Sequence, residues 1–477
     1  MDKKTPSSAP TKDSRNTKGR PGGRINYGER RRRSKPAVSS RLIVLDLMAE
    51  IIGKGHPLQD AVNTHKDWGK LEDRDRRFAR RLITIVLRYR RLARNILNRY
   101  LQKPINRKDR KAEAVLILAI VELVWADGDS YAVVDQAVRM MRGKGFTHMT
   151  GLANAVLRKV SKDQDTLKNE VFNPLDTAPA WLRDHLENDW GDEAQTIMAS
   201  FLKEPSLDFS CVRDPDDWAK RLDGALLAHG TVRRRDGMVT ALDGYDDGQW
   251  WVQDAAAAVP AQLLKAACGE MAGKHIIDLC AAPGGKTAQL IAMGADVTAL
   301  DQSGARMKTF SGNMKRLQMT PETIVADGTA WTPSEKVDAV LLDAPCSATG
   351  TLRRRPDILS HENAPDLKGL NTIQRDLFAA AAAWLKPGGI LIYATCSILK
   401  TEGEAIVADL PAGLTPSPID QGEIDGMSLT LNEHGHARIM PDAVDIASAK
   451  IIPEDMDSTD DIPQGNDGFF IARFIKS

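Results

Sequence analysis

The chain has 477 residues, more than one ordinary domain of roughly 150 residues, and its 42% hydrophobic and 27% charged composition is typical of a soluble globular protein. The sequence contains no apolar run of about 18 residues, so no membrane span is predicted. The polar, basic N-terminus lacks the apolar core of a secretory signal, and we therefore expect a cytoplasmic protein. The five cysteines are widely spaced and form no CxxC pair, which argues against a disulfide framework and a zinc site, and we expect no metal.

Positive charge is concentrated at the N-terminus. The first 40 residues hold twelve Lys or Arg against three acidic residues, a net charge of +9, although the whole chain is only +1. Residues 1–38 have almost no large apolar side chains and are predicted to be a disordered tail. A basic tail suits a polyanion such as RNA, although a solvated end with no specific partner explains the charge equally well.

Residues 39–162 predict an all-α domain of five to seven helices, because apolar residues recur there at helical spacing, as in Leu42–Ile52 and Ala114–Leu123. The opposite faces carry an unusual number of arginines: Arg74, Arg76, Arg77, Arg80, Arg81, Arg88, Arg90, Arg91 and Arg94. Salt bridges to neighbouring acidic side chains can neutralise part of this charge, but the excess of arginines over acidic residues favours contact with RNA.

Residues 163–249 are less regular and are predicted to form a linking subdomain. Helical periodicity comes first, over Trp181–Trp190 and Glu193–Phe201. Short strand-like runs follow, over Leu207–Val212 and Met238–Leu242.

From residue 250 to 477, short apolar strands alternate with helices, which predicts a Rossmann-like α/β domain with a mostly parallel sheet. The predicted strands are His275–Leu279, Asp296–Asp301, Thr323–Asp327, Val337–Asp343 and Gly389–Thr395. The predicted helices are Lys286–Met293, Ser303–Arg316, Leu370–Leu385 and Glu402–Ala408. Ligands of such sheets bind at the carboxyl ends of the strands, where every motif described next is located.

The first of these strands ends in the loop DLCAAPGGKT, residues 278–287, which leads into a predicted helix. Its small residues and two glycines let the backbone approach a ligand closely at the helix N-terminus. The loop is not a phosphate-binding P-loop, because Cys280 stands where that motif requires glycine, and the dinucleotide pattern GxGxxG is absent.

Acidic residues end the next two strands. Asp301, roughly 20 residues after the loop, is placed to bind a ribose hydroxyl, and Asp327 is placed to reach an adenine amine. Either aspartate taken alone is equally well explained as a turn or helix cap, but acids at three successive strand ends reduce the weight of that explanation. An adenosine ligand without a pyrophosphate is therefore predicted, and S-adenosylmethionine has that form.

Two further strands end in Asp343-Ala344-Pro345-Cys346-Ser347 and in Tyr393-Ala394-Thr395-Cys396-Ser397. Neighbouring strands would place both thiols over one pocket beside Asp343, although a lone cysteine is usually a small buried hydrophobe. A thiolate that adds to C6 of cytosine moves electron density onto C5, which can then attack a sulfonium methyl group. Lys286 and a helix N-terminus would favour the thiolate, and Asp343 is the candidate to stabilise the ring near N3 and its exocyclic amine.

The strings DLCAAPGGKT, DAPCSATG and YATCS resemble, in order, three motifs of the Sun/Fmu (Nol/Nop/Sun) family of RNA cytosine-C5 methyltransferases. Thr351–Asp357 resembles the family's arginine-bearing loop, Asp467–Ala472 its closing strand, and Trp251–Asp254 the start of its catalytic domain, so the likeness covers roughly residues 250–477. Gly151–Arg158 looks like part of the NusB-like RNA-binding domain of the bacterial RsmB-type branch, which modifies small-subunit ribosomal RNA.

This resemblance implies that Cys396 is the nucleophile and that Cys346 aids product release. It implies cofactor contacts at Cys280, Ala281, Ala282, Pro283, Gly284, Gly285, Lys286, Asp301, Asp327 and Asp343. S-adenosyl-L-methionine is then the cofactor and RNA the partner, and we expect a monomer.

Two features depart from the family pattern. Glu402-Gly403-Glu404 stands where the family often has Glu-Asn-Glu, and the acidic segment Asp442–Asn466 has no functional explanation. Two other functions were weighed. A non-catalytic ribosome-assembly or antitermination factor would have lost a thiol or a cofactor acid, and all are present. A DNA cytosine-C5 methyltransferase would use the Pro-Cys thiol and carry a target-recognition insert, whereas Cys396 at a second strand end favours the RNA type.

Overall fold

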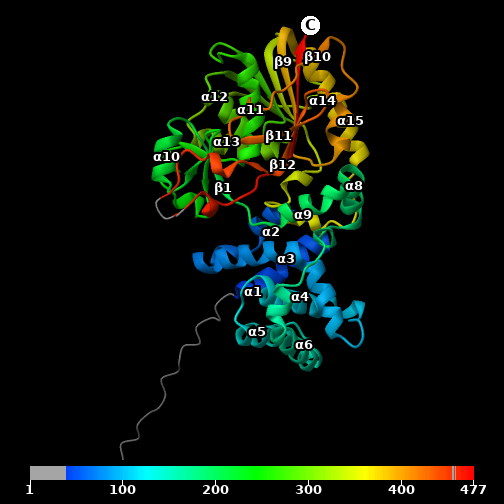
Figure 1. The fold of residues 1–477 in the computed structure, drawn as a ribbon. Coiled ribbons are helices and arrows are strands. Elements are labelled where there is room, and N and C mark those ends of the chain that lie inside the picture. The colour runs from blue at the N-terminus through cyan, green and yellow to red at the C-terminus, as the bar shows by residue number, and fades with distance from the viewer. Residues whose placement is uncertain (1–38, 454–455, 457) are drawn as a thin grey trace, which may run out of the picture. The chain divides into compact units, whose positions relative to one another are not determined.

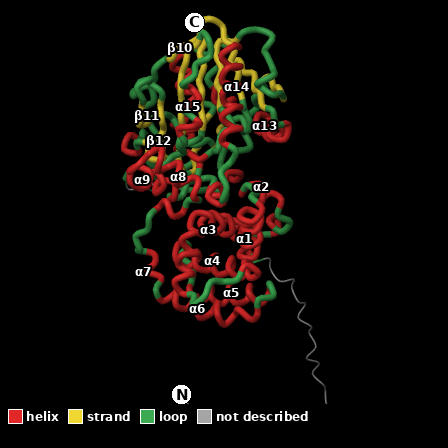
Figure 2. Tube along the Cα trace, turned by 90° about the vertical axis from the view of Figure 1, so that its right-hand side faces the viewer, coloured by secondary structure: helices red, strands yellow, loops and turns green. Residues whose placement is uncertain are grey.

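The structure of the chain is a computed structural model that describes residues 39–453, 456 and 458–477. The predicted basic tail, residues 1–38, lies outside the described residues. Residues Ser40–Ser477 pack as one unit, shown from two sides in Figures 1 and 2. No helix in the described part of the chain is both long and apolar enough to cross a membrane.

The N-terminal region is helical, as predicted for residues 39–162, and its last helix, α7, lies just beyond that range. The helices are α1 (Ser40–Met48), α2 (Leu58–Thr64), α3 (Asp73–Tyr100), α4 (Arg110–Trp125), α5 (Ser130–Gly143), α6 (Thr150–Lys162) and α7 (Gln164–Lys168), and a π-helix, Ala49–Gly53, continues α1. Helix α4 is buried from Val115 to Val124, so it forms the centre against which α1, α3, α5 and α6 pack (Figure 2).

The predicted RNA-facing arginines of α3 are largely used inside the protein. Arg88 and Arg90 are buried, and they donate hydrogen bonds to the carbonyl oxygens of Arg353 (2.6 Å) and Leu359 (3.3 Å). Arg90 also pairs with Glu362, and so does its neighbour Arg91. The prediction of RNA contact is therefore wrong for Arg88 and Arg90, because both side chains are buried and hold the helical region against residues 353–362.

The linking segment forms two helices, α8 (Ala180–Trp190) and α9 (Ala194–Leu202), and a small antiparallel sheet. The strands are β1 (Leu207–Cys211), β2 (Ala225–Leu226), β3 (Val232–Arg234) and β4 (Trp250–Val252), in the order β2-β3-β1-β4, and α10 spans Pro215–Arg221. The predicted strand Met238–Leu242 is wrong: Val239–Ala241 is a 3₁₀ turn. Val239 and Leu242 pack on the core around Trp218 and Trp250, so burial rather than strand pairing explains this apolar run.

Helices α8 and α9 support the strand ends of the catalytic sheet. Leu182, Met198 and Phe201 share one apolar cluster with Ala348 and Ile398, each of which lies two residues after a motif cysteine. The indole N–H of Trp190 donates a hydrogen bond to the carbonyl oxygen of Ile398 (3.1 Å), and this bond holds the loop that follows Cys396 against α8.

The C-terminal region contains the predicted parallel sheet. Its strands are β5 (His275–Leu279), β6 (Asp296–Asp301), β7 (Glu322–Val325), β8 (Val337–Asp343), β9 (Leu385–Thr395), β10 (Leu414–Pro416), β11 (Met427–Leu431), β12 (Ala437–Val444) and β13 (Phe469–Lys476). The order is β11-β12-β13-β9-β8-β5-β6-β7, with β10 beside β13. Strands β5 to β9 pair in parallel, and β10 to β13 add an antiparallel edge.

Helices cover both faces of this sheet, which confirms the predicted α/β class (Figure 1). They are α11 (Ala255–Cys268), α12 (Gly285–Ala292), α13 (Gly304–Arg316), α14 (Leu367–Trp384) and α15 (Glu404–Val407). Successive strand residues alternate between the two cores: Leu341 packs with α11, whereas Leu342 packs with α14. The central strand β8 is therefore buried on both faces, whereas β7 at the edge of the sheet is mostly exposed.

The acidic segment Asp442–Asn466 is partly structured. Its start belongs to β12, Ile446 and Ile462 are buried in the catalytic core, and Ile451 bridges to Leu226 of the small sheet. Its described residues therefore join the linking segment to the catalytic region.

A buried ion pair stabilises the small sheet. Asp208 of β1 accepts hydrogen bonds from Arg233 Nε (2.8 Å) and Nη2 (2.6 Å) and from the Ala255 amide at the start of α11 (3.1 Å). The two charged side chains are 2% and 0% exposed. Burial alone would raise the pKa of Asp208, but the charge and hydrogen bonds of Arg233 outweigh it and hold the pKa below 3.8.

We expect Asp208→Ala to lower the free energy of unfolding by about 3–5 kcal/mol, because it leaves the Arg233 charge buried without a partner. Asp243→Ala, which removes an exposed pair with Arg221, should cost less than about 1 kcal/mol in the same urea titration. Since the folded pKa of Asp208 lies below 3.8, its contribution is complete above that value and is lost as the pH falls through the folded pKa. If Asp208→Ala and Asp243→Ala lowered the free energy of unfolding by the same amount, the buried pair would not be the stronger contribution to stability.

Candidate active site

The loop after β5 is held tightly by its own backbone. The amides of Cys280 and Ala281 both donate to the carbonyl of Leu300, at 2.8 and 3.1 Å, so the loop crosses the end of β6. Gly284 has a φ of +106°, and a Cβ there would lie 2.8 Å from Met314 and 2.9 Å from Phe310. Only glycine fits this turn, which leads directly into α12. The loop Cys280–Lys286 thus lies at the carboxyl edge of the sheet, as the sequence predicted.

Asp301 and Asp327 lie in different surroundings. Asp301 ends β6, is buried, and accepts hydrogen bonds from the amides of Ala282 (3.3 Å) and Ser303 (2.9 Å). It also pairs with Arg306, whose exposed side chain can turn away to free the carboxylate. Asp301 therefore joins the loop after β5 to the end of β6, where the sequence predicts a carboxylate that binds a ribose hydroxyl.

Asp327 lies two residues beyond the end of β7, which is shorter than predicted. Its side chain is exposed, and Oδ1 accepts hydrogen bonds from the Thr329 amide (2.9 Å) and hydroxyl (2.8 Å). These bonds lower the pKa of Asp327 below 3.8. Asp327 is thus a turn cap in this structure, while its other carboxylate oxygen faces away from these bonds.

Lys286 and Asp343 form an ion pair beside the thiols. Lys286 Nζ lies 2.8 Å from Asp343 Oδ2 and 5.3 Å from the centroid of the Phe469 ring. Burial alone would lower the pKa of Lys286, but the charge and hydrogen bond of Asp343, with a smaller contribution from Cys396, raise it above 10.5. Lys286 therefore stays protonated and provides a fixed positive charge next to Asp343 and Cys396.

The two motif cysteines meet, although they are 50 residues apart in the sequence. Cys346 Sγ and Cys396 Sγ are 3.5 Å apart, from the ends of the adjacent parallel strands β8 and β9. The hydrogen bond between the two thiols, together with burial and the negative charges of Cys396 and Glu402, raises the pKa of Cys346 well above 9.0. Cys346 therefore keeps its proton at neutral pH while a second thiol lies beside it.

A buried glutamate joins the two cysteine loops. The carboxylate of Glu402 accepts hydrogen bonds from the Ser347 amide (2.8 Å), the Ser347 hydroxyl, the Ser397 hydroxyl (2.6 Å) and Gln374 Nε2 (3.2 Å). Ser347 and Ser397 each directly follow a motif cysteine. Sequence reasoning left Glu402 without a role. The Cys-Ser pair that occurs at both strand ends could have indicated that the two serines bind a common partner.

Arg354 adds a second cation near the thiols. Its Nε donates to Asp467 Oδ2 (2.9 Å) and lies 3.9 Å from Asp254 Oδ2. Asp467 and Asp254 are buried, whereas the Arg354 side chain is 40% exposed and interacts electrostatically with Cys396. Burial first, and then the neighbouring charge of Asp467, raise the pKa of Asp254 to about 6. Arg354 thus adds a positive charge that interacts with Cys396, and the sequence placed it in the arginine-bearing loop 351–357 without assigning it a role.

The site therefore contains a thiol pair, a lysine–aspartate pair and an arginine at one sheet edge. Such a set can activate a sulfur nucleophile and stabilise charge on a planar ring. No group of three or more His, Cys, Asp or Glu side chains among the residues that the structure describes is arranged to hold a metal ion.

Residues 266–475 match the sequence model of the family described as 16S rRNA methyltransferase RsmB/F, and residues 38–162 match that of the NusB family. The ribosomal RNA small subunit methyltransferase B of Xylella fastidiosa (strain Temecula1) is 31% identical over 457 residues, covering 92% of this chain and 98% of that protein. The protein of the same name from Cronobacter sakazakii is 29% identical, covering 93% and 100%. The crystal structure of PH0851, at 21% identity and a TM-score of 0.66, has the same fold over 93% of this chain and 100% of its own.

Proposed function

The chain belongs to the RsmB/F family of 16S rRNA methyltransferases, and we propose that it transfers a methyl group from S-adenosylmethionine to C5 of a cytosine in small-subunit ribosomal RNA. The observation that carries this proposal is the thiol pair, Cys346 and Cys396, at 3.5 Å beside the Lys286–Asp343 ion pair. An enzyme that methylates an exocyclic amine or a ribose hydroxyl needs no such sulfur nucleophile, whereas C5 of cytosine requires one.

S-adenosylmethionine, when bound, supplies an electrophilic methyl group on a positively charged sulfur. The residues present fit its adenosine part: Asp301 offers a buried carboxylate at the end of β6, and the glycine-containing loop Cys280–Lys286 lies at the same edge of the sheet. Cys280, Ala281, Ala282, Pro283, Gly284, Gly285, Lys286, Asp301, Asp327 and Asp343 are the proposed cofactor contacts. Asp327 contributes its free carboxylate oxygen.

Cys396 is the proposed nucleophile. Its thiolate forms a bond to C6, and the C5–C6 π electrons make C5 a nucleophile that takes the methyl group. The proposed role of Asp343, which is held by Lys286, is to bind the ring near N3 and the exocyclic amine as charge develops there. Loss of the C5 proton to a base then restores the C5–C6 double bond, the S–C6 bond breaks, and Cys396 returns as a thiolate.

Cys346 is suited to be that base. Its pKa is raised by the hydrogen bond and the negative charge of Cys396, so Cys346 does not compete as a nucleophile in the free enzyme. Both influences disappear once Cys396 is an uncharged thioether in the adduct. Cys346 then releases its proton to solvent more easily, and the resulting thiolate takes the C5 proton and becomes a thiol again.

The test is transfer of labelled methyl from S-adenosylmethionine to a transcript of unmodified small-subunit rRNA, followed by digestion to nucleosides. We expect the label in 5-methylcytidine and none with a duplex DNA of the same sequence. Label in another nucleoside would contradict C5 chemistry. An absence of transfer to rRNA, together with tight rRNA binding, would favour a non-catalytic assembly factor.

A further inference from the structure

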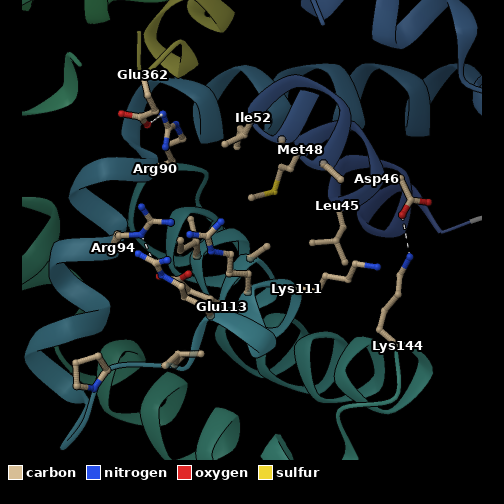
Figure 3. A pocket seen from close by; sticks show the side chains of 18 of the residues that line it. Leu45, Asp46, Met48, Ile52, Arg90, Arg94, Lys111, Glu113, Lys144 and Glu362 are labelled. Carbon is tan, nitrogen blue, oxygen red and sulfur yellow. Dashed lines mark hydrogen bonds and ion pairs between the residues drawn. The ribbon is translucent and has the colours of Figure 1, made fainter. Parts of the chain in front are cut away.

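A cleft of about 780 Å³ opens on the helical region, between α1 with its π-helical extension, α3 and the start of α4 (Figure 3). Its volume lies within the roughly 300–1,000 Å³ typical of small-ligand sites. The thiols and the cofactor loop do not line it, so the proposed methyl transfer leaves it without a role.

One part of the cleft is apolar. Figure 3 shows Leu45 and Met48 of α1 and Ile52 of the π-helix on one wall, and Ile105 and Ile117 complete the lining. The π-helix Ala49–Gly53 adds a residue to the turn and keeps Ile52 on the cleft side with Ala49. A flat, uncharged group can be buried against this aliphatic surface.

The other part of the cleft is cationic. Its lining holds six cations, Arg90, Arg94, Arg107, Arg110, Lys111 and Lys144, against three acids, Asp46, Glu113 and Glu362. The three acids are each paired: Lys144 with Asp46, Arg94 with Glu113, and Arg90 with Glu362 (dashed in Figure 3). Arg107, Arg110 and Lys111 are exposed and form no ion pair with any described residue, so the cleft keeps three uncompensated positive charges.

The positions of these charges are electrostatically unfavourable. Arg110 and Lys111 occupy the first turn of the 16-residue helix α4, where the helix dipole already provides positive potential and acidic residues are favoured. Lys103, Arg107 and Lys108 precede them, with Asp109 as the one acid between residues 103 and 111. A bound anion would relieve this repulsion, and guanidinium groups suit phosphate oxygens.

We propose that this cleft binds an unpaired segment of the RNA substrate, with phosphates on Arg107, Arg110 and Lys111 and one base against the aliphatic wall. The proposal rests on the proposed function for the choice of RNA, because an anionic chain with flat, apolar faces matches both parts of the cleft. Unpaired RNA exposes base faces that a duplex hides. Glu362, in the loop before α14, borders the cleft, so the cleft is lined by the C-terminal region as well as by the helical region.

The charge test uses the full chain with Arg107→Gln, Arg110→Gln and Lys111→Gln combined. We expect Kd for unmodified small-subunit rRNA and KM for methyl transfer to rise about tenfold, with kcat unchanged. The slope of log K against log salt should fall by about 2, since each phosphate contact to single strands contributes about 0.7. The matched control changes three exposed lysines elsewhere that form no ion pair with the part of the chain the structure describes, Lys220→Gln, Lys308→Gln and Lys315→Gln, and should leave both values unaltered.

The base test uses Ala114→Phe, which fills the cleft from α4 without a charge change. It should weaken binding of a labelled oligouridylate while leaving the salt slope at the wild-type value, and far-UV circular dichroism should match wild type. Equal competition by duplex RNA and by oligouridylate would overturn the unpaired-base assignment.

The combined charge variant also distinguishes RNA from an acidic protein as the partner of the cleft. If it binds rRNA like the lysine control but loses affinity for polyglutamate, the cleft is a protein site and the RNA proposal is wrong. Wild-type protein that binds rRNA through these residues without methylating it would support the cleft while contradicting the proposed function. If wild-type protein methylates rRNA and the charge variant has an unchanged KM, the proposed function is supported and the cleft proposal is contradicted.

Discussion

Cys396→Ala should lose methyl transfer to rRNA by a factor of at least on the order of 10³, because no other group can add to C6 and make C5 nucleophilic. Lys286, Asp343 and the loop Cys280–Lys286 keep their contacts in this variant, since none of their hydrogen bonds passes through Cys396. The Kd for S-adenosylmethionine, measured by isothermal titration calorimetry, should therefore stay within about twofold of wild type.

The matched control for this variant is Cys268→Ala, which makes the same chemical change at the end of α11, outside the site. It should retain wild-type kcat. Substantial turnover by Cys396→Ala would show that the sulfur of Cys396 is not the nucleophile. A parallel loss of cofactor affinity would show instead that Cys396 acts through the shape of the site.

Glu402→Gln should lower kcat by about 10²-fold, with little change in KM for S-adenosylmethionine. The carboxylate accepts from the Ser347 amide, the Ser347 and Ser397 hydroxyls and Gln374. An amide replaces one acceptor oxygen with an NH₂ donor, which opposes these donors, so the loops carrying Cys346 and Cys396 separate. Glu402 contacts neither thiol sulfur directly, so it is a positioning residue.

General destabilisation would also lower the apparent kcat without changing KM, because it reduces the amount of active enzyme, so kcat must be expressed per active site. Fraction-active titration with labelled cofactor supplies that correction. Glu433→Gln, the same change on an exposed side chain, should leave kcat at the wild-type value. Wild-type kcat per active site in Glu402→Gln would remove the proposed link between the two loops.

The sequence was most informative where local pattern and chemistry coincide. Strands β5, β6 and β8 were predicted to the residue because each is an apolar run that ends in a polar motif. The thiols of Cys346 and Cys396 were expected over one pocket because adjacent parallel strands end at one edge, and they lie 3.5 Å apart. Short strands such as β2 and β3 have too few residues to show a period, so the small sheet was largely missed.

Long-range contacts could not be predicted from local pattern. Arg88 lies on a polar helical face by sequence, yet it is buried because it meets the carbonyl of Arg353, 265 residues away. Glu402 likewise depends on two loops that come together only in the folded chain. The unpaired cations near Arg107 were overlooked because the arginine-rich stretch of α3 dominates the charge pattern, although most of those arginines are paired.

The most direct measurement of the central claim is a denaturing gel of enzyme incubated with S-adenosylmethionine and unmodified small-subunit rRNA. Wild type, Cys396→Ala, Cys346→Ala and the double variant are compared. We predict a covalent RNA–protein adduct with Cys346→Ala, because the C5 proton then stays in place and the S–C6 bond cannot break, and none with Cys396→Ala or the double variant. An adduct that forms with Cys396→Ala and vanishes with Cys346→Ala would contradict the account and assign the nucleophile to Cys346.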